Sequence, residues 1–473
     1  MHLSQKVAPL GPVFETPINT IYVWTISGVG ALGGLLFGYD WVVIGGAKPF
    51  YEKYFHLVSA SQQGWAMSCA LIGCLIGALI SGMLSNRFGR KLPLLVSALV
   101  FAGSSIGVAL AGQLAVFVLW RMMGGFAIGL ASSLSPMYIA ELAPAHLRGK
   151  LVSLNQLTLV IGILLAQLAN WLIARPVPYN ATANDILYSW NGQIGWRWMF
   201  GVTVIPSLFF LIAMFFVPES PRWLASKGLL SKAEAILTRI GGSAYSQSVS
   251  LEIQTSLQRD LAKTTLHSLL EKKMLKVLAL GVFLAVLQQW CGINVIFNYA
   301  EEVFSAAGYQ VSDILFNIVV TGAVNVVFTL VALRTVDRYG RRILMLFGTS
   351  GLAIIYSVLA FLYHRHSHGL HMLLLVVAAI ACYAMSLAPV TWVVISEMFP
   401  GRIRSAAVSI SVTALWIACF VLTYTFPILN NSVGAAGTFW IYSGICALGF
   451  IYFALRLPET KGKSLESIER MWD

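Results

Sequence analysis

Long apolar blocks and short polar intervals alternate along the whole chain. Each block is close to the ~20 residues that an α-helix needs to cross a bilayer. The blocks are continuously apolar and lack the alternation of a barrel strand, so we predict helices. The twelve blocks cover roughly 21–46, 65–84, 92–111, 116–140, 151–173, 199–217, 277–299, 314–333, 343–363, 372–395, 406–426 and 439–457. The pattern therefore predicts an all-α membrane protein with twelve transmembrane helices.

The longest polar interval divides these blocks into six and six. It covers residues 219–276 and carries several lysines and arginines. We predict a six-helix bundle over 1–218, a cytoplasmic helical linker over 219–276, and a second six-helix bundle with a cytoplasmic tail over 277–473.

Composition supports the membrane interpretation. Hydrophobic residues make up 58% of the chain and charged residues only 11%, whereas soluble proteins carry about a quarter charged residues. The net charge of +12 does not indicate nucleic-acid binding, because 25 of the 31 Lys and Arg residues fall in the tails and in the loops on the same side. The positive-inside rule places both termini in the cytoplasm. We expect a multi-pass protein of the plasma membrane, such as a bacterial inner membrane.

The two halves of the chain repeat each other. The basic loop at 86–91 (NRFGRK) has a counterpart at 337–342 (DRYGRR). Three further residues recur at one constant spacing, with Glu141, Pro144 and Arg148 matched by Glu397, Pro400 and Arg404. A duplicated six-helix half is typical of alternating-access transporters.

With these motifs, the chain resembles the major facilitator superfamily, and specifically its sugar porter family. The likeness also rests on PESPR at 218–222, PETKG at 458–462, GWR at 195–197 and QQWCGIN at 288–294. These motifs are similar to those of bacterial D-xylose:proton symporters and facilitative glucose transporters. The resemblance implies the major facilitator fold and alternating-access transport of a monosaccharide of the D-xylose or D-glucose type, with proton symport as the favoured mode.

An acid inside the apolar blocks is a candidate proton carrier. Asp40 lies within the first block, and a charged group in the membrane is costly enough to indicate function. Burial raises the pKa of an aspartate and a nearby cation lowers it, so a mobile cation can make it bind and release a proton. Arg121, in the fourth block, is the expected partner, and the resemblance implies that the two residues are neighbours. A static structural ion pair is the alternative.

A sugar carries many hydroxyls and no charge, so its site should offer neutral amides and aromatic faces. On an ideal helix Gln289 and Asn294 lie about 140° apart, so Gly292 between them suggests a local break. Interhelical hydrogen bonds are the alternative role of each single amide. The candidate sugar-binding residues, which match sugar-contacting positions of the xylose symporters, are Gln156, Gln288, Gln289, Asn294, Asn325, Trp392 and Trp416.

The basic loops and the acids near them are expected to act as a gate. We expect ion pairs among these residues to close the cytoplasmic side in the outward-facing state. The candidate gating residues are Arg90, Glu141, Arg148, Glu219, Arg341, Glu397, Arg404 and Glu459.

Three positions depart from the xylose symporter pattern. Ile163 and Leu415 replace glutamines, and Thr203 stands where a second membrane acid can occur. A facilitative uniporter therefore stays open as an alternative, and so does a sugar sensor. We find no nucleophile with its base and no metal-ligand spacing, so we predict no enzyme activity, no metal and no cofactor. The expected partners are the monosaccharide, protons and lipid, and the expected state is a monomer.

Overall fold

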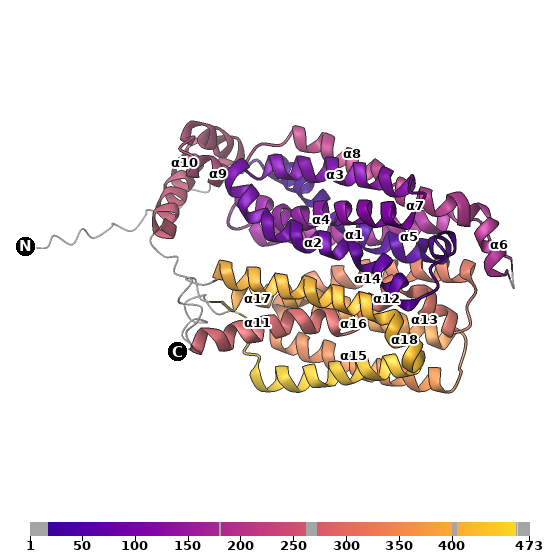
Figure 1. Ribbon diagram of the computed structural model, residues 1–473. Helices are drawn as coiled ribbons and strands as arrows, with labels where there is room; N and C mark the ends of the chain where they lie inside the picture. Colours follow the sequence, from indigo (N-terminus) through magenta and orange to yellow (C-terminus); the bar gives the residue numbers. More distant parts are fainter. Residues whose placement is uncertain (1–17, 179–180, 262–271, 400–403, 460, 462–473) are drawn as a thin grey trace, which may run out of the picture.

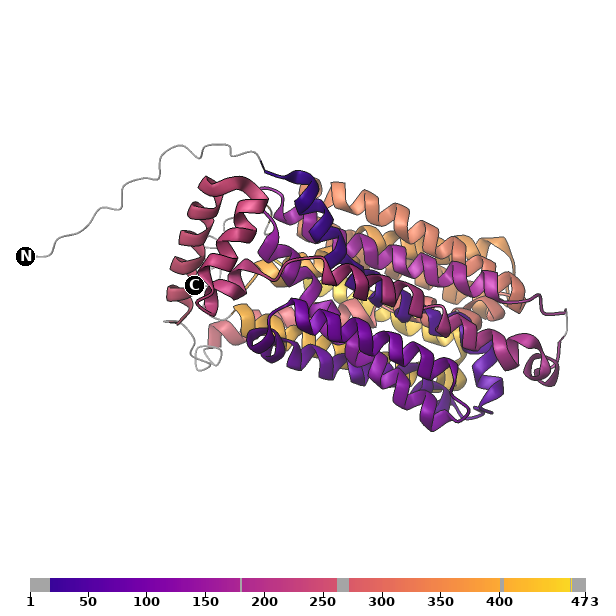
Figure 2. The same ribbon diagram turned by 90° about the horizontal axis from the view of Figure 1, so that it is seen from above.

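The computed structural model describes residues 18–178, 181–261, 272–399, 404–459 and 461. Within these ranges the secondary structure is helical, as predicted. Figures 1 and 2 show two helical bundles lying side by side, with α9 (Pro221–Ser226) and α10 (Leu230–Leu261) across one end. We call this the linker end and the opposite one the far end.

The first bundle contains the helices that precede α9. Its helices lie at the predicted apolar blocks with bounds that differ by a few residues, and α1 continues well beyond the end of its block at Gly46. The helices are α1 (Thr20–Tyr54), α2 (Ala60–Phe88), α3 (Lys91–Ala109), α4 (Leu114–Leu142), α5 (Arg148–Ile173), the short α6 (Ala183–Tyr188), and a last crossing made of the π-helix η1 (Asn191–Gly195), α7 (Trp196–Gly201) and α8 (Val204–Phe215).

The second bundle begins at α11, slightly before the predicted block. Its helices are α11 (Lys272–Trp290), α12 (Ile293–Asn298), α13 (Ala300–Ala306), α14 (Val311–Tyr339), α15 (Arg341–His364), α16 (Leu370–Met385), α17 (Leu387–Glu397) and α18 (Arg404–Arg456). Figure 1 shows α18 doubling back on itself. The reversal occurs at Gly434, whose φ of 71° lies in the region that favours glycine.

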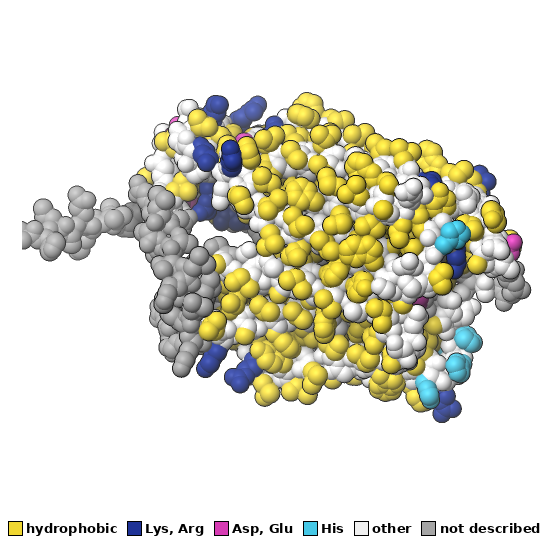
Figure 3. All heavy atoms as spheres, viewed as in Figure 1, with side chains coloured by type: hydrophobic (Ala, Val, Ile, Leu, Met, Phe, Trp, Pro, Cys, Tyr) yellow, Lys and Arg dark blue, Asp and Glu magenta, His cyan; other side chains and the backbone are white. Residues whose placement is uncertain are grey.

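The described residues include eleven helices that are long and apolar enough to cross a membrane. The last of them covers 51 residues, Ala406–Arg456, and contains the reversal at Gly434. Hydrophobic side chains cover the middle of the molecule in Figure 3, whereas Lys and Arg side chains gather mainly at the linker end.

Glycines allow close packing inside the first bundle. A Cβ at Gly38 in α1 would meet the backbone of Leu159 in α5, and one at Gly162 would meet the backbone of Leu35. On the next helix pair, Gly125 of α4 faces the backbone of Ala70 in α2. Small residues at membrane helix interfaces bring backbones together where the hydrophobic effect cannot drive association. These contacts fix α1 and α4, the helices that carry Asp40 and Arg121.

The two bundles touch at the far end. The hydroxyls of Ser61 in α2 and Tyr424 in α18 are 2.9 Å apart, and the backbone N–H of Val177 donates to the Ser312 hydroxyl at 3.0 Å. At the linker end, Figure 3 shows the surface hollowed between the bundles. Among the described residues, the bundles are thus in contact at the far end and separated by this hollow at the linker end.

Candidate functional site

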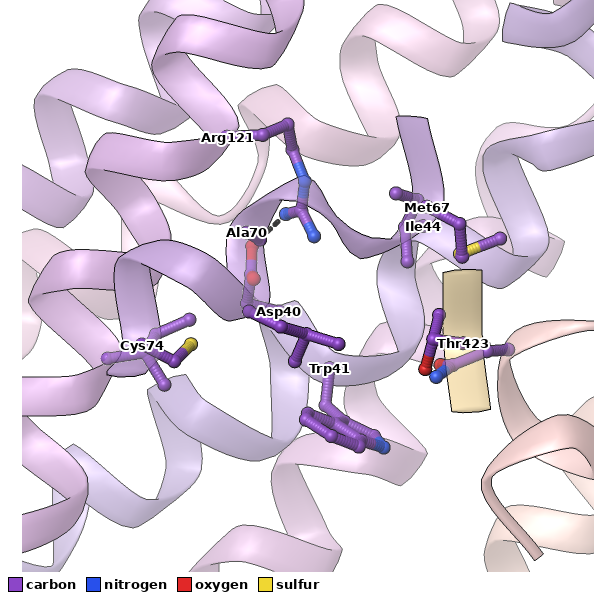
Figure 4. A pocket seen from close by; sticks show the side chains of 11 residues that line it. Asp40, Trp41, Ile44, Met67, Ala70, Cys74, Arg121 and Thr423 are labelled. Carbon is purple, nitrogen blue, oxygen red and sulfur yellow. Dashed lines mark hydrogen bonds and ion pairs between the residues drawn. The ribbon is translucent and has the colours of Figure 1, made fainter. Parts of the chain in front are cut away.

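Asp40 and Arg121 form a buried ion pair in the first bundle. Arg121 Nη1 donates to Asp40 Oδ1 at 2.5 Å, and the two residues are 4% and 7% exposed, respectively. The guanidinium also lies over the ring of Phe200, 5.5 Å from its centre. Figure 4 shows the two side chains pointing toward each other from α1 and α4. Each of these buried charges is stabilised mainly by the other. A movement that separates them would therefore leave both charges buried without a partner.

A small cavity adjoins this ion pair and reaches the second bundle. Its volume is about 20 Å³, and its walls include Trp41 and Met67 from the first bundle and Asn298 and Thr423 from the second. Such a cavity has room for about one water molecule but not for a sugar. Asp40 thus lies where the second bundle meets α1, and a change in the packing of the bundles would change its surroundings.

The candidate amides of the second bundle lie at a helix break. α11 ends at Trp290 and α12 begins at Ile293, with Gly292 between them at a φ of 84°. The break at Gly292 is thus present, and it brings Gln289 and Asn294 into contact. Asn294 Nδ2 donates to Gln289 Oε1 at 2.5 Å, and Gln289 Nε2 donates to Gln288 Oε1 at 2.8 Å. All three amides are buried.

The remaining candidate sugar-binding residues come from four other helices. Asn325 of α14 and Trp416 of α18 are buried, Gln156 of α5 is half-buried, and Trp392 of α17 is 40% exposed. The indole ring of Trp392 is therefore only partly covered by other parts of the protein. Ile163, Leu415 and Thr203, the three positions that depart from the xylose symporter pattern, are all buried.

The structure also reveals an aromatic group that the sequence did not indicate. The ring of Trp416 lies 5.8 Å from Phe37 and 6.3 Å from Trp41, both on α1. Such spacings are typical of favourable aromatic pairs. Trp416 therefore connects the two bundles. The sequence signal for this contact is the spacing of Phe37 and Trp41, which lie one helical turn apart on α1 and close to Asp40.

At the linker end, three of the four candidate gating residues of the first bundle form one network. Arg90 donates from Nε and Nη2 to the two carboxylate oxygens of Glu141, both at 2.8 Å. Glu219 accepts the backbone N–H of Arg90 at 2.9 Å and that of Lys91 at 3.1 Å. A carboxylate on the first N–H groups of a helix satisfies donors that have no partner within the helix. Glu219 therefore anchors the start of α3 to the segment that follows α8.

The second bundle repeats this network. Arg341 Nη2 lies 3.2 Å from Glu397 Oε1, and Glu459 accepts the backbone N–H groups of Arg341 and Arg342 at 2.9 and 3.0 Å. The ion pairs Arg90–Glu141 and Arg341–Glu397 each join residues of one bundle.

The duplicated arginines are not equally placed by the structure. Arg148 is exposed at the start of α5. Arg404 begins α18, but its side chain lies outside the described part of the chain, as does Pro400.

Known proteins with similar sequences are sugar transporters. The family model described as "Sugar (and other) transporter" matches residues 26–472. The D-xylose-proton symporter of Escherichia coli K12 is 39% identical over 490 residues, with 97% of each chain covered. The arabinose-proton symporter of Bacillus subtilis is 37% identical, with 95% of each chain covered.

Solved structures agree with the sequences. The inward-open xylose transporter of E. coli gives a TM-score of 0.83 at 37% identity and covers 96% of this chain and all of its own. The same transporter bound to 6-bromo-6-deoxy-D-glucose gives a TM-score of 0.79 at 38% identity, with 96% of this chain and all of its own covered. The chain therefore belongs to the sugar transporter family, and it is a multi-pass membrane transporter and not an enzyme.

Proposed function

We propose that this protein moves a monosaccharide of the D-xylose or D-glucose type by alternating access, in symport with protons. The observation that carries the proposal is the buried pair of Asp40 and Arg121, 2.5 Å apart in the first bundle and beside a cavity that the second bundle completes. An acid that exchanges a buried arginine for water during the cycle can bind and release a proton. The proton-coupled names of the E. coli and B. subtilis relatives agree with this mechanism.

We assign the sugar to the amides at the helix break. Gln288, Gln289 and Asn294 offer donors and acceptors to hydroxyl groups, and their side chains bond to one another. A sugar would replace these mutual bonds. Gln156 and Asn325 would add further amides, and Trp392 and Trp416 would supply rings for the C–H face of the sugar.

Alternating access needs two bundles that rock about the site. We count twelve crossings, because α18 reverses at Gly434, and we place the linker end with both termini in the cytoplasm by the positive-inside rule. The hollow at the linker end then makes this the inward-facing state. The residues of the networks around Arg90 and Arg341, with Arg148 and Arg404, would form ion pairs that close that end in the outward-facing state. We propose a monomer as the transporting unit.

A facilitative uniporter is the second candidate. Thr203 is buried and carries no carboxylate, and Ile163 replaces an amide. In that case Asp40 would serve only as the partner of Arg121.

Uptake into proteoliposomes distinguishes the two. We expect labelled D-xylose or D-glucose to accumulate above its outside concentration when the outside is made acidic, and proton uptake to accompany it. Equilibration without accumulation or proton uptake would establish the uniporter, and no uptake of any pentose or hexose in a competition panel would contradict sugar transport itself.

A further inference from the structure

A lysine beyond the end of the first apolar block is buried at the far end. The apolar block that predicts the first span ends at Gly46, but α1 continues to Tyr54 and encloses Lys48, which is 3% exposed. Its Nζ lies 3.2 Å from Glu52 Oε2, 3.2 Å from Glu301 Oε2 and 2.6 Å from Glu302 Oε1. One ammonium thus binds three carboxylates.

These carboxylates come from both bundles. Glu52 lies one turn after Lys48 on α1, whereas Glu301 and Glu302 stand in the first turn of α13. The Lys48 ammonium also lies 5.9 Å from the ring centre of Tyr299, which precedes α13. Two of the three ion pairs of Lys48 therefore exist only while the bundles are together at this end.

Burial makes these contacts strong. The side chains of Lys48 and Glu52 are almost completely removed from water, and those of Glu301 and Glu302 are largely so. A charge that loses its partner and stays buried costs far more free energy than an exposed one, because no water is present to replace the lost attraction. Surface ion pairs, by contrast, contribute little.

Water can nevertheless reach the group when the bundles separate. A cavity of about 210 Å³ adjoins it, with Gln63 of α2 on one side and Asn430 and Asn431 of α18 on the other. Residues of both bundles line this cavity, so separation at the far end would widen it and hydrate the charges. Separation of the bundles would therefore exchange the ion pairs of Lys48 with Glu301 and Glu302 for contacts with water.

We propose that Lys48, Glu52, Glu301 and Glu302 form a latch, which we call the Lys48 latch, that holds the bundles together at the far end and sets the balance between the two conformations of the transport cycle. The latch must break each time the far end opens and re-form each time it closes. It rests on the proposed alternating access but not on the identity of the sugar or on proton coupling.

The test measures the conformation directly. Spin labels attached at Val58→Cys and Leu370→Cys report the separation of the bundles at the far end. Pulsed electron paramagnetic resonance measures the distance between the two labels. Val58 and Leu370 are 88% and 65% exposed and belong to opposite bundles. The six native cysteines are buried, which favours labelling at the introduced sites. In nanodiscs without sugar, we expect Lys48→Met to raise the ratio of long to short distances by about tenfold or more, because one turn of α13 loses its anchor.

Two further variants make the result decisive. Lys53→Met removes the same charge from the next turn of α1, where the side chain is half-buried, and should leave the distances unchanged. The triple variant Lys48→Met/Glu301→Gln/Glu302→Gln lacks both the ammonium and the acids opposite it, and it should also favour the open state. If the triple variant returns to the wild-type distance distribution, the opening in Lys48→Met comes only from repulsion between the acids, and the latch is overturned. An unchanged distribution in Lys48→Met would also overturn it.

The distance measurement does not depend on transport activity, so its result is independent of the proposed proton coupling. An intact latch in a protein that fails to concentrate sugar would refute only the proposed coupling. Thermal unfolding of each labelled variant confirms that it is folded. If Lys48→Met does not fold, Glu301→Gln/Glu302→Gln with Lys48 retained takes its place, and an unchanged distribution there would equally overturn the proposal.

Discussion

Replacing Asp40 by asparagine should separate proton coupling from sugar binding. The amide keeps the size of the side chain but has no proton to exchange and no charge to offer Arg121. The guanidinium, 4% exposed and 2.5 Å from its present partner, would then be buried without an anion. Breaking a buried pair in this way costs about 3–5 kcal/mol, which is a factor of roughly 10² to 10⁴ in any equilibrium that requires the pair.

This magnitude predicts how the variants compare in stability. Asp40→Asn should lower the thermal stability of the purified protein. The double variant Asp40→Asn/Arg121→Leu should recover much of the loss, because removing both charges leaves no unpaired one. Glu252→Gln, an exposed acid of α10, is the matched control and should change nothing.

Transport in proteoliposomes provides the functional measurement. With an acidic exterior, wild-type protein and Glu252→Gln should concentrate labelled sugar, whereas Asp40→Asn should only equilibrate it. Sugar exchange across the membrane, which needs no net proton movement, should survive in Asp40→Asn. Accumulation by Asp40→Asn at the wild-type level would refute the assignment of Asp40 as proton carrier.

Other variants test the sugar site, the linker-end network and the packing of the first bundle. Gln288→Ala should weaken sugar binding by about 5- to 150-fold in calorimetry, since a sugar hydroxyl left unpaired costs about 1–3 kcal/mol, whereas exposed Gln113→Ala should bind normally. Arg90→Met should slow turnover with little change in sugar affinity; an unchanged rate would exclude a gating role. Gly38→Ala should lower the melting temperature because its Cβ would meet the backbone of α5, whereas Gly103→Ala, which has open space, should be tolerated.

Local patterns in the sequence predicted the features that depend on short stretches of chain. Apolar blocks gave the approximate positions of the membrane crossings, because each crossing needs about 20 residues of apolar helix. The break at Gly292 was also predictable, since two candidate amides on either side of a glycine could not share one face of a regular helix. The repeat of Arg90 and Glu141 as Arg341 and Glu397 predicted equivalent networks in the two halves.

Features that join distant parts of the chain were not predictable. Lys48 lies beyond the first apolar block, where hydropathy falls, but its partners Glu301 and Glu302 lie about 250 positions away and help to bury it. The contact of Trp416 with α1 arises in the same way. Glu219 was expected among the ion pairs of the gate, and its carboxylate also accepts backbone N–H groups at the start of α3, a role that composition does not indicate.

The carboxylates that cap α3 and α15 have a consequence for how the gene can be divided. Glu219 follows the last helix of the first bundle and Glu459 follows the last helix of the second, and each returns to the third helix of its own half. In each half, the carboxylate and the helix start that it caps therefore belong to the same half of the chain. A gene cut within the linker should yield two polypeptides that each insert and fold, and that then associate in the membrane into a working carrier.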